Sequence, residues 1–150
     1  MFFTPCFDYL HVIVAGYIKE SIFYYYLKTL KLSDYTSIIG SMLYAFCAFT
    51  IVGGGWYIFS FESFNMALLL LAFEKLYTQR NWYLFPIAIF LMGISQPFNL
   101  FPYGLFIATY AILRLFQNDD FNVKSFGIVF GQMLGLGIIG VLAAGPFLLE

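Results

Sequence analysis

The sequence predicts an all-α fold, and more narrowly a polytopic membrane helix bundle with about six transmembrane or membrane-embedded helices. Composition is the first observation behind this prediction, since 62% of the residues are hydrophobic and only 10% are charged. Soluble domains carry about 25% charged residues, so this chain has too little polar surface to cover a water-soluble globule. The second observation is that the apolar residues form long continuous runs, which favours helices over alternating strands. The charges, which cluster in the gaps between the runs, are the third.

Six apolar segments follow one another along the chain. A bilayer core of about 30 Å takes about 20 helical residues to cross, and the first, second and sixth segments reach this length. The third and fourth are short and would need a locally thinned bilayer or a partly buried position. We expect the six helices at residues 9–30, 36–59, 62–77, 82–96, 100–116 and 124–149.

The basic residues indicate which gaps face the cytoplasm. Six of the seven lie beside every second gap, and the positive-inside rule places such gaps on the cytoplasmic side. Both ends of the chain are then extracytoplasmic, as are Glu62 and the uncharged stretch 96–102. We expect residues 1–150 to form a single transmembrane domain that is a fragment of a larger, multi-pass protein. The six cations are Lys28, Lys31, Lys75, Arg80, Arg114 and Lys124.

The first segment carries two charges near its middle, Lys19 and Glu20, where ionised side chains are costly and usually functional. Neighbouring residues on a helix point about 100° apart, so these two do not form a simple pair. Lys19 shares one helical face with Asp8, His11 and Ala15. This polar stripe predicts a path or cradle for an anionic group, with Lys19 as a phosphate contact. The alternative is that partners on neighbouring helices neutralise Lys19 and Glu20, and that His11 is an interfacial hydrogen-bonding residue.

The gap between the second and third segments holds two further candidates. Gly53, Gly54 and Gly55 form either a simple turn or a place where the backbone approaches a ligand closely. Glu62 follows at the start of the third segment. It is either a favourable acid at a helix amino terminus or an outer carboxylate that faces the substrate.

The outer turn between the fourth and fifth segments combines amides, prolines and aromatic rings. Pro97 and Pro102 stop the flanking helices, and Gln96 and Asn99 supply the amides. Aromatic rings beside amide donors suit contacts with a sugar or a lipid. They also suit a plain interfacial loop, and the composition favours this second interpretation.

In the sixth segment Gly127, Gly131 and Gly135 recur every four residues, with Gly137 and Gly140 beyond them, which predicts close packing against another helix. The polar loop at residues 117–123 is interpreted as a solvated turn before a helix and not as a metal site. Cys47 is interpreted as a small core residue. The chain has no zinc-ligand spacing, phosphate-binding loop or Ser-His-Asp arrangement, and no basic cluster that would indicate nucleic acid.

Several stretches succeed one another in an order and spacing that are typical of one membrane protein family. They are Tyr26–Ser33, Ile39–Phe46, Leu70–Leu76, then Ile94 and Ser95 leading through Tyr103, Phe106 and Tyr110 to Arg114, and finally Gly145 and Pro146. Between Lys19 and Phe116, about two-thirds of its length, the chain resembles the bacterial YfhO-like membrane proteins, which belong with the GT-C glycosyltransferases.

The resemblance implies a large multi-spanning enzyme of the bacterial plasma membrane. Such an enzyme moves a sugar from a polyprenyl-phosphate carrier to an extracytoplasmic cell-envelope acceptor, such as a cell-wall polymer or lipoteichoic acid. Its partners are then the lipid bilayer, the lipid-linked sugar and the acceptor polymer. GT-C enzymes place an essential acid in the first outer loop. The main catalytic acid is therefore expected to lie before this chain, unless Asp8 belongs to the end of that loop.

Sugar transfer from a lipid phosphate needs a carboxylate that orients or deprotonates the acceptor hydroxyl. It also needs a cation beside the departing phosphate, either a side chain or a divalent metal. The catalytic candidates are Asp8 and Glu62, and the substrate-binding candidates are Lys19, His11, Gln96 and Asn99. Two other functional classes stay open. A transporter or flippase would line its pathway with the polar first helix, and a non-catalytic scaffold would use its helices for packing alone.

Overall fold

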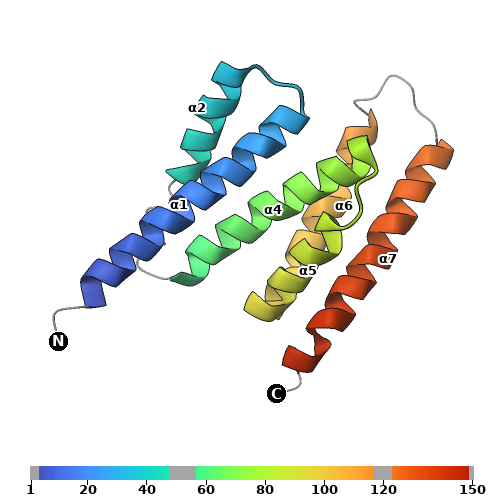
Figure 1. Cartoon of the computed structure of the whole chain (residues 1–150). Helices are drawn as coiled ribbons and strands as arrows, with labels where there is room; N and C mark the ends of the chain where they lie inside the picture. The colour runs from blue at the N-terminus through green and yellow to red at the C-terminus, as the bar shows by residue number, and fades with distance from the viewer. Residues whose placement is uncertain (1–3, 48–56, 117–122, 149–150) are drawn as a thin grey trace. The chain divides into compact units, whose positions relative to one another are not determined.

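The computed structural model describes residues 4–47, 57–116 and 123–148 (Figure 1). Within these residues every regular element is a helix and none is a strand, which confirms the predicted all-α class. The chain divides into two compact units, Met1–Leu71 and Ala72–Glu150. The boundary between them falls inside one helix, α4.

Among the described residues, three helices contribute to the first unit. Helix α1 spans Thr4–Thr29 and helix α2 spans Asp34–Ala45, and the two pack against each other after a short turn (Figure 1). Helix α4, Tyr57–Gln79, contributes its first part to this unit. With 26 and 23 residues, α1 and α4 are about 39 Å and 35 Å long. Both are therefore longer than the hydrocarbon core of a bilayer, which is about 30 Å thick.

The turn between α1 and α2 is closed by backbone hydrogen bonds. Lys31 adopts the left-handed conformation, with φ 62°. Its N–H donates to the carbonyl oxygen of Lys28 at 2.9 Å. The N–H of Leu32 donates to the carbonyl oxygen of Leu27 at 3.4 Å. This pair of bonds is a Schellman motif, with a lysine at the position where glycine is usual. Ser33 then caps the amino end of α2.

Small side chains allow α2 to approach α1 closely. Ser37, Ser41 and Ala45 recur every four residues and form the buried face of α2. A Cβ atom added at Gly40 would lie 2.7 Å from Cδ1 of Leu27 in α1. The two helices are therefore held at a separation that small residues on α2 permit.

Tyr44 connects the three helices of the first unit. Its ring stacks on that of Phe23 in α1, with the ring centroids 4.1 Å apart and the planes 6° from parallel. Its hydroxyl donates a hydrogen bond of 2.6 Å to the carbonyl oxygen of Ser63 in α4. One side chain of α2 thus contacts both α1 and α4.

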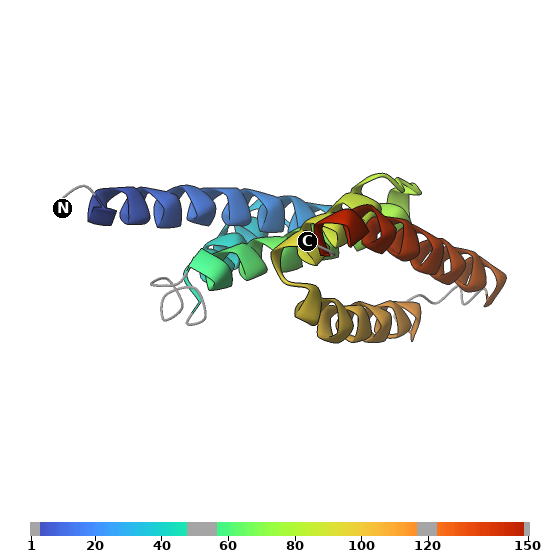
Figure 2. The same ribbon diagram turned by 90° about the horizontal axis from the view of Figure 1, so that it is seen from below.

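The second unit contains the end of α4 followed by α5, α6 and α7. These helices span Leu84–Ser95, Leu100–Phe116 and Val123–Leu148. A 3-10 turn, η2 at Pro97–Asn99, separates α5 from α6, because Pro97 has no N–H with which to continue the helix. Helix α7 packs along α5 (Figure 2).

Helices α5 and α7 meet at two glycines. A Cβ atom added at Gly140 of α7 would lie 2.8 Å from Cβ of Ile89 and 2.9 Å from the carbonyl oxygen of Pro86. One added at Gly93 of α5 would lie 2.8 Å from Cβ of Ala144. Each glycine therefore sits where the neighbouring helix leaves no room for a side chain.

Of the glycines predicted to pack, Gly140 lies in this contact, whereas Gly127, Gly131 and Gly135 contact nothing among the described residues. Nothing lies within 4 Å of a Cβ atom placed at any of the three. The buried positions of α7 are instead Val129, Met133, Gly140 and Ala144. The contact therefore uses two larger apolar side chains, Val129 and Met133, and two small residues, Gly140 and Ala144.

The predicted second helix, residues 36–59, is wrong in its extent. Helix α2 ends at Ala45, and the N–H of Phe46 caps it by donating to the carbonyl oxygen of Met42 at 3.0 Å. Tyr57, inside the predicted segment, already belongs to α4. The apolar run continues past the end of α2, so hydropathy carries no sign of the break.

In the described part of the chain, one helix is long and apolar enough to cross a membrane. It is the 20-residue stretch Gly127–Pro146 of α7. Helices α1 and α4 have the length, but charged side chains interrupt both. Helices α2 and α5, with 12 residues each, are only about 18 Å long. The structure therefore supports membrane association through one candidate span, which is coarser than the predicted bundle.

Candidate functional site

Lys19 lies on the buried side of α1. Its side chain is 0% exposed, and Nζ has no hydrogen-bond partner among the described residues. Burying an ammonium without an acceptor is very costly in a medium of low dielectric constant. Cys47, just past the end of α2, is close enough to interact with Lys19 electrostatically. Lys19 thus has a buried amino group whose N–H donors are left unused by the described side chains.

Glu20 follows Lys19 directly and points elsewhere. It is half-buried and lines a groove of about 210 Å³ between α1 and α2. The two charges are not hydrogen-bonded to each other, as expected for residues about 100° apart on a helix. The other residues that line the groove are Ser21, Tyr24, Tyr25, Ile38 and Ser41.

For the rest of the predicted polar stripe, the structure describes the helical backbone and not the side chains. Asp8 and His11 belong to α1, and their side chains lie outside the described residues. The glycines at 53–55 and the polar loop at 117–122 also lie outside them. The structure therefore places Lys19 and Glu20 in the first helix and leaves the stripe around them as a prediction.

Glu62 lies inside α4 and not at its amino terminus. The helix begins at Tyr57, so Glu62 is the sixth residue, beyond the first turn where the helix dipole favours an acid. The interpretation as a helix-start acid is therefore wrong, because α4 begins within the predicted second segment. The Glu62 side chain is half-buried and belongs to the same unit as Lys19.

Gln96 and Asn99 are brought together in the second unit. Nδ2 of Asn99 donates to Oε1 of Gln96 at 3.0 Å, and the Asn99 N–H donates to the Gln96 carbonyl oxygen at 3.1 Å. These bonds close the η2 turn, beside which the ring of Phe98 is 92% exposed. The predicted residues therefore fall in two units, Asp8, His11, Lys19 and Glu62 in the first and Gln96 and Asn99 in the second.

A buried ion pair that the sequence does not single out lies in the second unit. The side chain of Glu74 in α4 is 0% exposed. Arg114 of α6 donates from Nε to Oε1 at 2.9 Å and from Nη2 to Oε2 at 3.4 Å. The hydroxyl of Tyr110 also donates to Oε1, at 2.7 Å. Both carboxylate oxygens thus have donors, and the pair holds α6 against α4.

The sequence contained a sign of this pair. Glu74 interrupts one apolar run and Arg114 lies at the end of another, although the positive-inside rule predicts Arg114 to be a cation beside a cytoplasmic gap. The structure shows its guanidinium engaged with a buried carboxylate 40 residues away. Glu74, Tyr110 and Arg114 all lie in stretches that carry the family resemblance.

No family model matches the chain, and neither a curated protein nor a solved structure matches it. The resemblance to the YfhO-like proteins therefore depends on the sequence stretches alone. Among the described residues no group of three or more His, Cys, Asp or Glu side chains could hold a metal ion.

Proposed function

We propose that the chain is part of a multi-spanning membrane glycosyltransferase of the GT-C kind. The enzyme would transfer a sugar from a polyprenyl-phosphate carrier to an extracytoplasmic cell-envelope acceptor. The observation that carries this proposal is the buried ammonium of Lys19. A polyprenyl phosphate consists of an anionic group on a lipid tail. The phosphate can pair with the ammonium of Lys19, and the tail can contact the apolar helices around it.

The position of Lys19 favours phosphate over other partners. Three N–H donors are available at Nζ, and Glu20 lines a separate groove. Phosphate oxygens accept charge-assisted hydrogen bonds, which are the stronger kind. Charge grows on the phosphate as the sugar leaves, and an ammonium in a site without water stabilises that charge more than it would in water. Glu62 and Asp8 then supply the carboxylates that orient the acceptor hydroxyl.

Helix length and charge pairing support the multi-spanning arrangement. Helices α1, α4 and α7 each have at least 23 residues, enough to cross a core of about 30 Å. The pairing of Glu74 with Arg114 reduces the cost of placing α4 and α6 in lipid. The short helices α2 and α5 would be embedded without crossing. Lys31 and Arg80 follow α1 and α4, and the positive-inside rule places both in the cytoplasm.

Sugar transfer by membranes that contain the native protein tests the proposal. Lys19→Met removes the ammonium and keeps the apolar stem, so we expect transfer to fall about 100-fold, as when a charge-stabilising donor is lost. Lys19→Arg keeps the charge and should retain part of the activity. Lys75→Met is the matched control, since Lys75 lies near the carboxyl end of α4, beside a predicted cytoplasmic gap. Transfer within twofold of the native rate for Lys19→Met, at equal expression, would contradict the proposal.

A further inference from the structure

The groove between α1 and α2 is a second candidate site, which the proposed sugar transfer does not use. Its volume is about 210 Å³, roughly that of seven water molecules in the liquid. Five of its six lining residues carry an oxygen atom in the side chain, and the sixth is Ile38. The groove therefore has the size and the polarity of a site for one small polar group.

The two serines offer this groove acceptors and not donors. The hydroxyl of Ser21 donates its hydrogen to the carbonyl oxygen of Tyr17 at 2.9 Å. The hydroxyl of Ser41 donates its hydrogen to the carbonyl oxygen of Ile38, also at 2.9 Å. Each hydroxyl oxygen keeps lone pairs for a ligand, and its single hydrogen is already used. A donor-rich group is therefore the better match.

Glu20 supplies a negative charge that nothing in the described part of the chain pairs. The nearby cation on α1, Lys28, is engaged in a salt bridge with Asp34. A carboxylate that is half-buried among apolar helices favours a cationic partner. The rings of Tyr24 and Tyr25 also line the groove, and aromatic faces attract ammonium and guanidinium groups.

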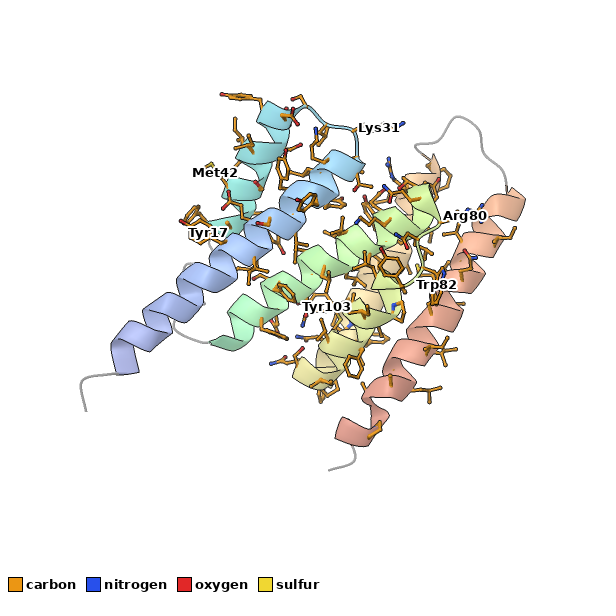
Figure 3. The ribbon with its side chains drawn as sticks, in the orientation of Figure 1. Tyr17, Lys31, Met42, Arg80, Trp82 and Tyr103 are labelled. Carbon is orange, nitrogen blue, oxygen red and sulfur yellow. The ribbon has the colours of Figure 1, made fainter. Side chains whose placement is uncertain are left out.

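The rim of the groove is apolar and exposed. Tyr17 is 68% exposed and lies one turn before Ser21 on α1, and Met42 next to Ser41 on α2 is 50% exposed. Figure 3 labels both side chains on the α1 and α2 pair. Ile38 is 48% exposed. A ligand held by Glu20 would therefore continue over an apolar surface.

We infer that this groove binds the ammonium or guanidinium group of an amphiphilic organic cation. Glu20 pairs with the charge, Ser21 and Ser41 accept its hydrogen bonds, and the exposed rim contacts its alkyl tail. This inference goes beyond the proposed function, because an anionic sugar phosphate would be repelled by Glu20. The first helix then presents a cation to one ligand through Lys19 and an anion to another through Glu20.

Binding to the full chain, purified in dodecyl maltoside micelles, tests the inference. The probes are dodecylamine and dodecylguanidine, with dodecanol and dodecyl phosphate as controls of equal tail length, and tyrosine fluorescence is the readout. Both cations are expected to bind at least about tenfold more tightly than dodecanol, the ratio that one charge-assisted contact provides. Equal affinity for dodecanol would overturn the inference, since it would mean a purely apolar site.

Substitutions assign the effect to this groove. Glu20→Gln keeps the shape of the side chain and should remove the preference for cations, whereas Glu62→Gln and Lys19→Met should keep it. Ser41→Val tests the same site from α2 and should weaken amine binding if Glu20→Gln does not fold. An unchanged preference in both Glu20→Gln and Ser41→Val would overturn the inference. The amine-binding assay does not depend on sugar transfer. The result for this groove can therefore be interpreted whether or not Lys19→Met loses transfer activity.

The source of the cation can be distinguished in the same micelles. Competition by phosphatidylethanolamine would identify a lipid headgroup as one source of the ammonium. Without such competition, single-chain amines are the ligands. Both outcomes support a cation site, provided that dodecylamine binding still requires Glu20.

Discussion

At the scale of single residues, the buried charges fall into two kinds. Glu74 has 0% exposure and receives hydrogen bonds from Arg114 and Tyr110. Lys19 has the same exposure, and no described residue accepts a hydrogen bond from it. A satisfied pair is explained by helix packing, because both charges are compensated within the chain. A buried cation without an acceptor calls for a ligand, which is why the proposed function depends on Lys19.

The Glu74 pair predicts a characteristic pattern in a double-mutant cycle. Arg114→Met should lower the free energy of unfolding by about 3–5 kcal/mol, because it leaves a buried carboxylate uncompensated. Adding Glu74→Leu should recover most of that loss. Denaturant titration in micelles, followed by circular dichroism, measures both. Arg80→Met is the control, since Arg80 is exposed. A double variant as unstable as Arg114→Met alone would contradict this role.

The left-handed conformation of Lys31 predicts a second residue-scale effect. A β-branched side chain tolerates φ 62° poorly, so Lys31→Val should lower the free energy of unfolding by about 1–3 kcal/mol. Lys31→Asn should be close to neutral, because asparagine visits this region more readily. Thermal unfolding of the two variants side by side measures the difference. Equal melting temperatures would show that the turn can rearrange without cost.

At the scale of elements, the glycines of α7 divide into packed and open positions. Gly140 would place a Cβ atom 2.9 Å from the carbonyl oxygen of Pro86, a backbone atom that cannot move aside freely. Gly135 would place one in open space. The same substitution in one helix should therefore have opposite effects at the two sites.

The variants Gly140→Ala and Gly135→Ala test this division. Gly140→Ala should lower the free energy of unfolding by about 1–3 kcal/mol through overpacking against α5. Gly135→Ala should raise it by about 0.5–1 kcal/mol, since alanine favours a helix. The same micelle unfolding assay serves for both. A destabilised Gly135→Ala would mean that another element covers this face of α7.

The helices that the sequence predicted correctly are those whose ends coincide with a change in composition. Helix α6, predicted at 100–116, has those bounds, because Pro97 and the polar loop mark its ends. Helix α2 was missed as a short element, since Phe46 and Cys47 are as apolar as the residues before them. The Glu74–Arg114 pair was missed for another reason. Its partners are 40 residues apart, and only the packing of α6 on α4 brings them together.

At the scale of the whole molecule, the cations that follow two of the helices are the basis of the proposed orientation. Lys31 and Arg80 follow α1 and α4, and Phe98 occupies the turn between α5 and α6. In the proposed topology Lys31 and Arg80 face the cytoplasm and Phe98 faces the outside. This arrangement is a prediction for the native membrane.

Cysteine labelling of intact cells tests this topology. In a variant without Cys6 and Cys47, a membrane-impermeant maleimide should label Phe98→Cys from outside. Arg80→Cys should react only after the membrane is opened, because the proposed topology places its loop in the cytoplasm. Labelling of both positions from the same side would contradict the multi-spanning arrangement.

Direct binding of polyprenyl phosphate to the chain in micelles tests the central claim most directly, with polyprenol as the ligand that lacks only the phosphate. The native chain should prefer the phosphate by at least about tenfold. Lys19→Met should abolish this preference and Lys75→Met should keep it. Equal affinity of the native chain for the two lipids, or an undiminished preference in Lys19→Met, would contradict the role of Lys19 as a phosphate contact.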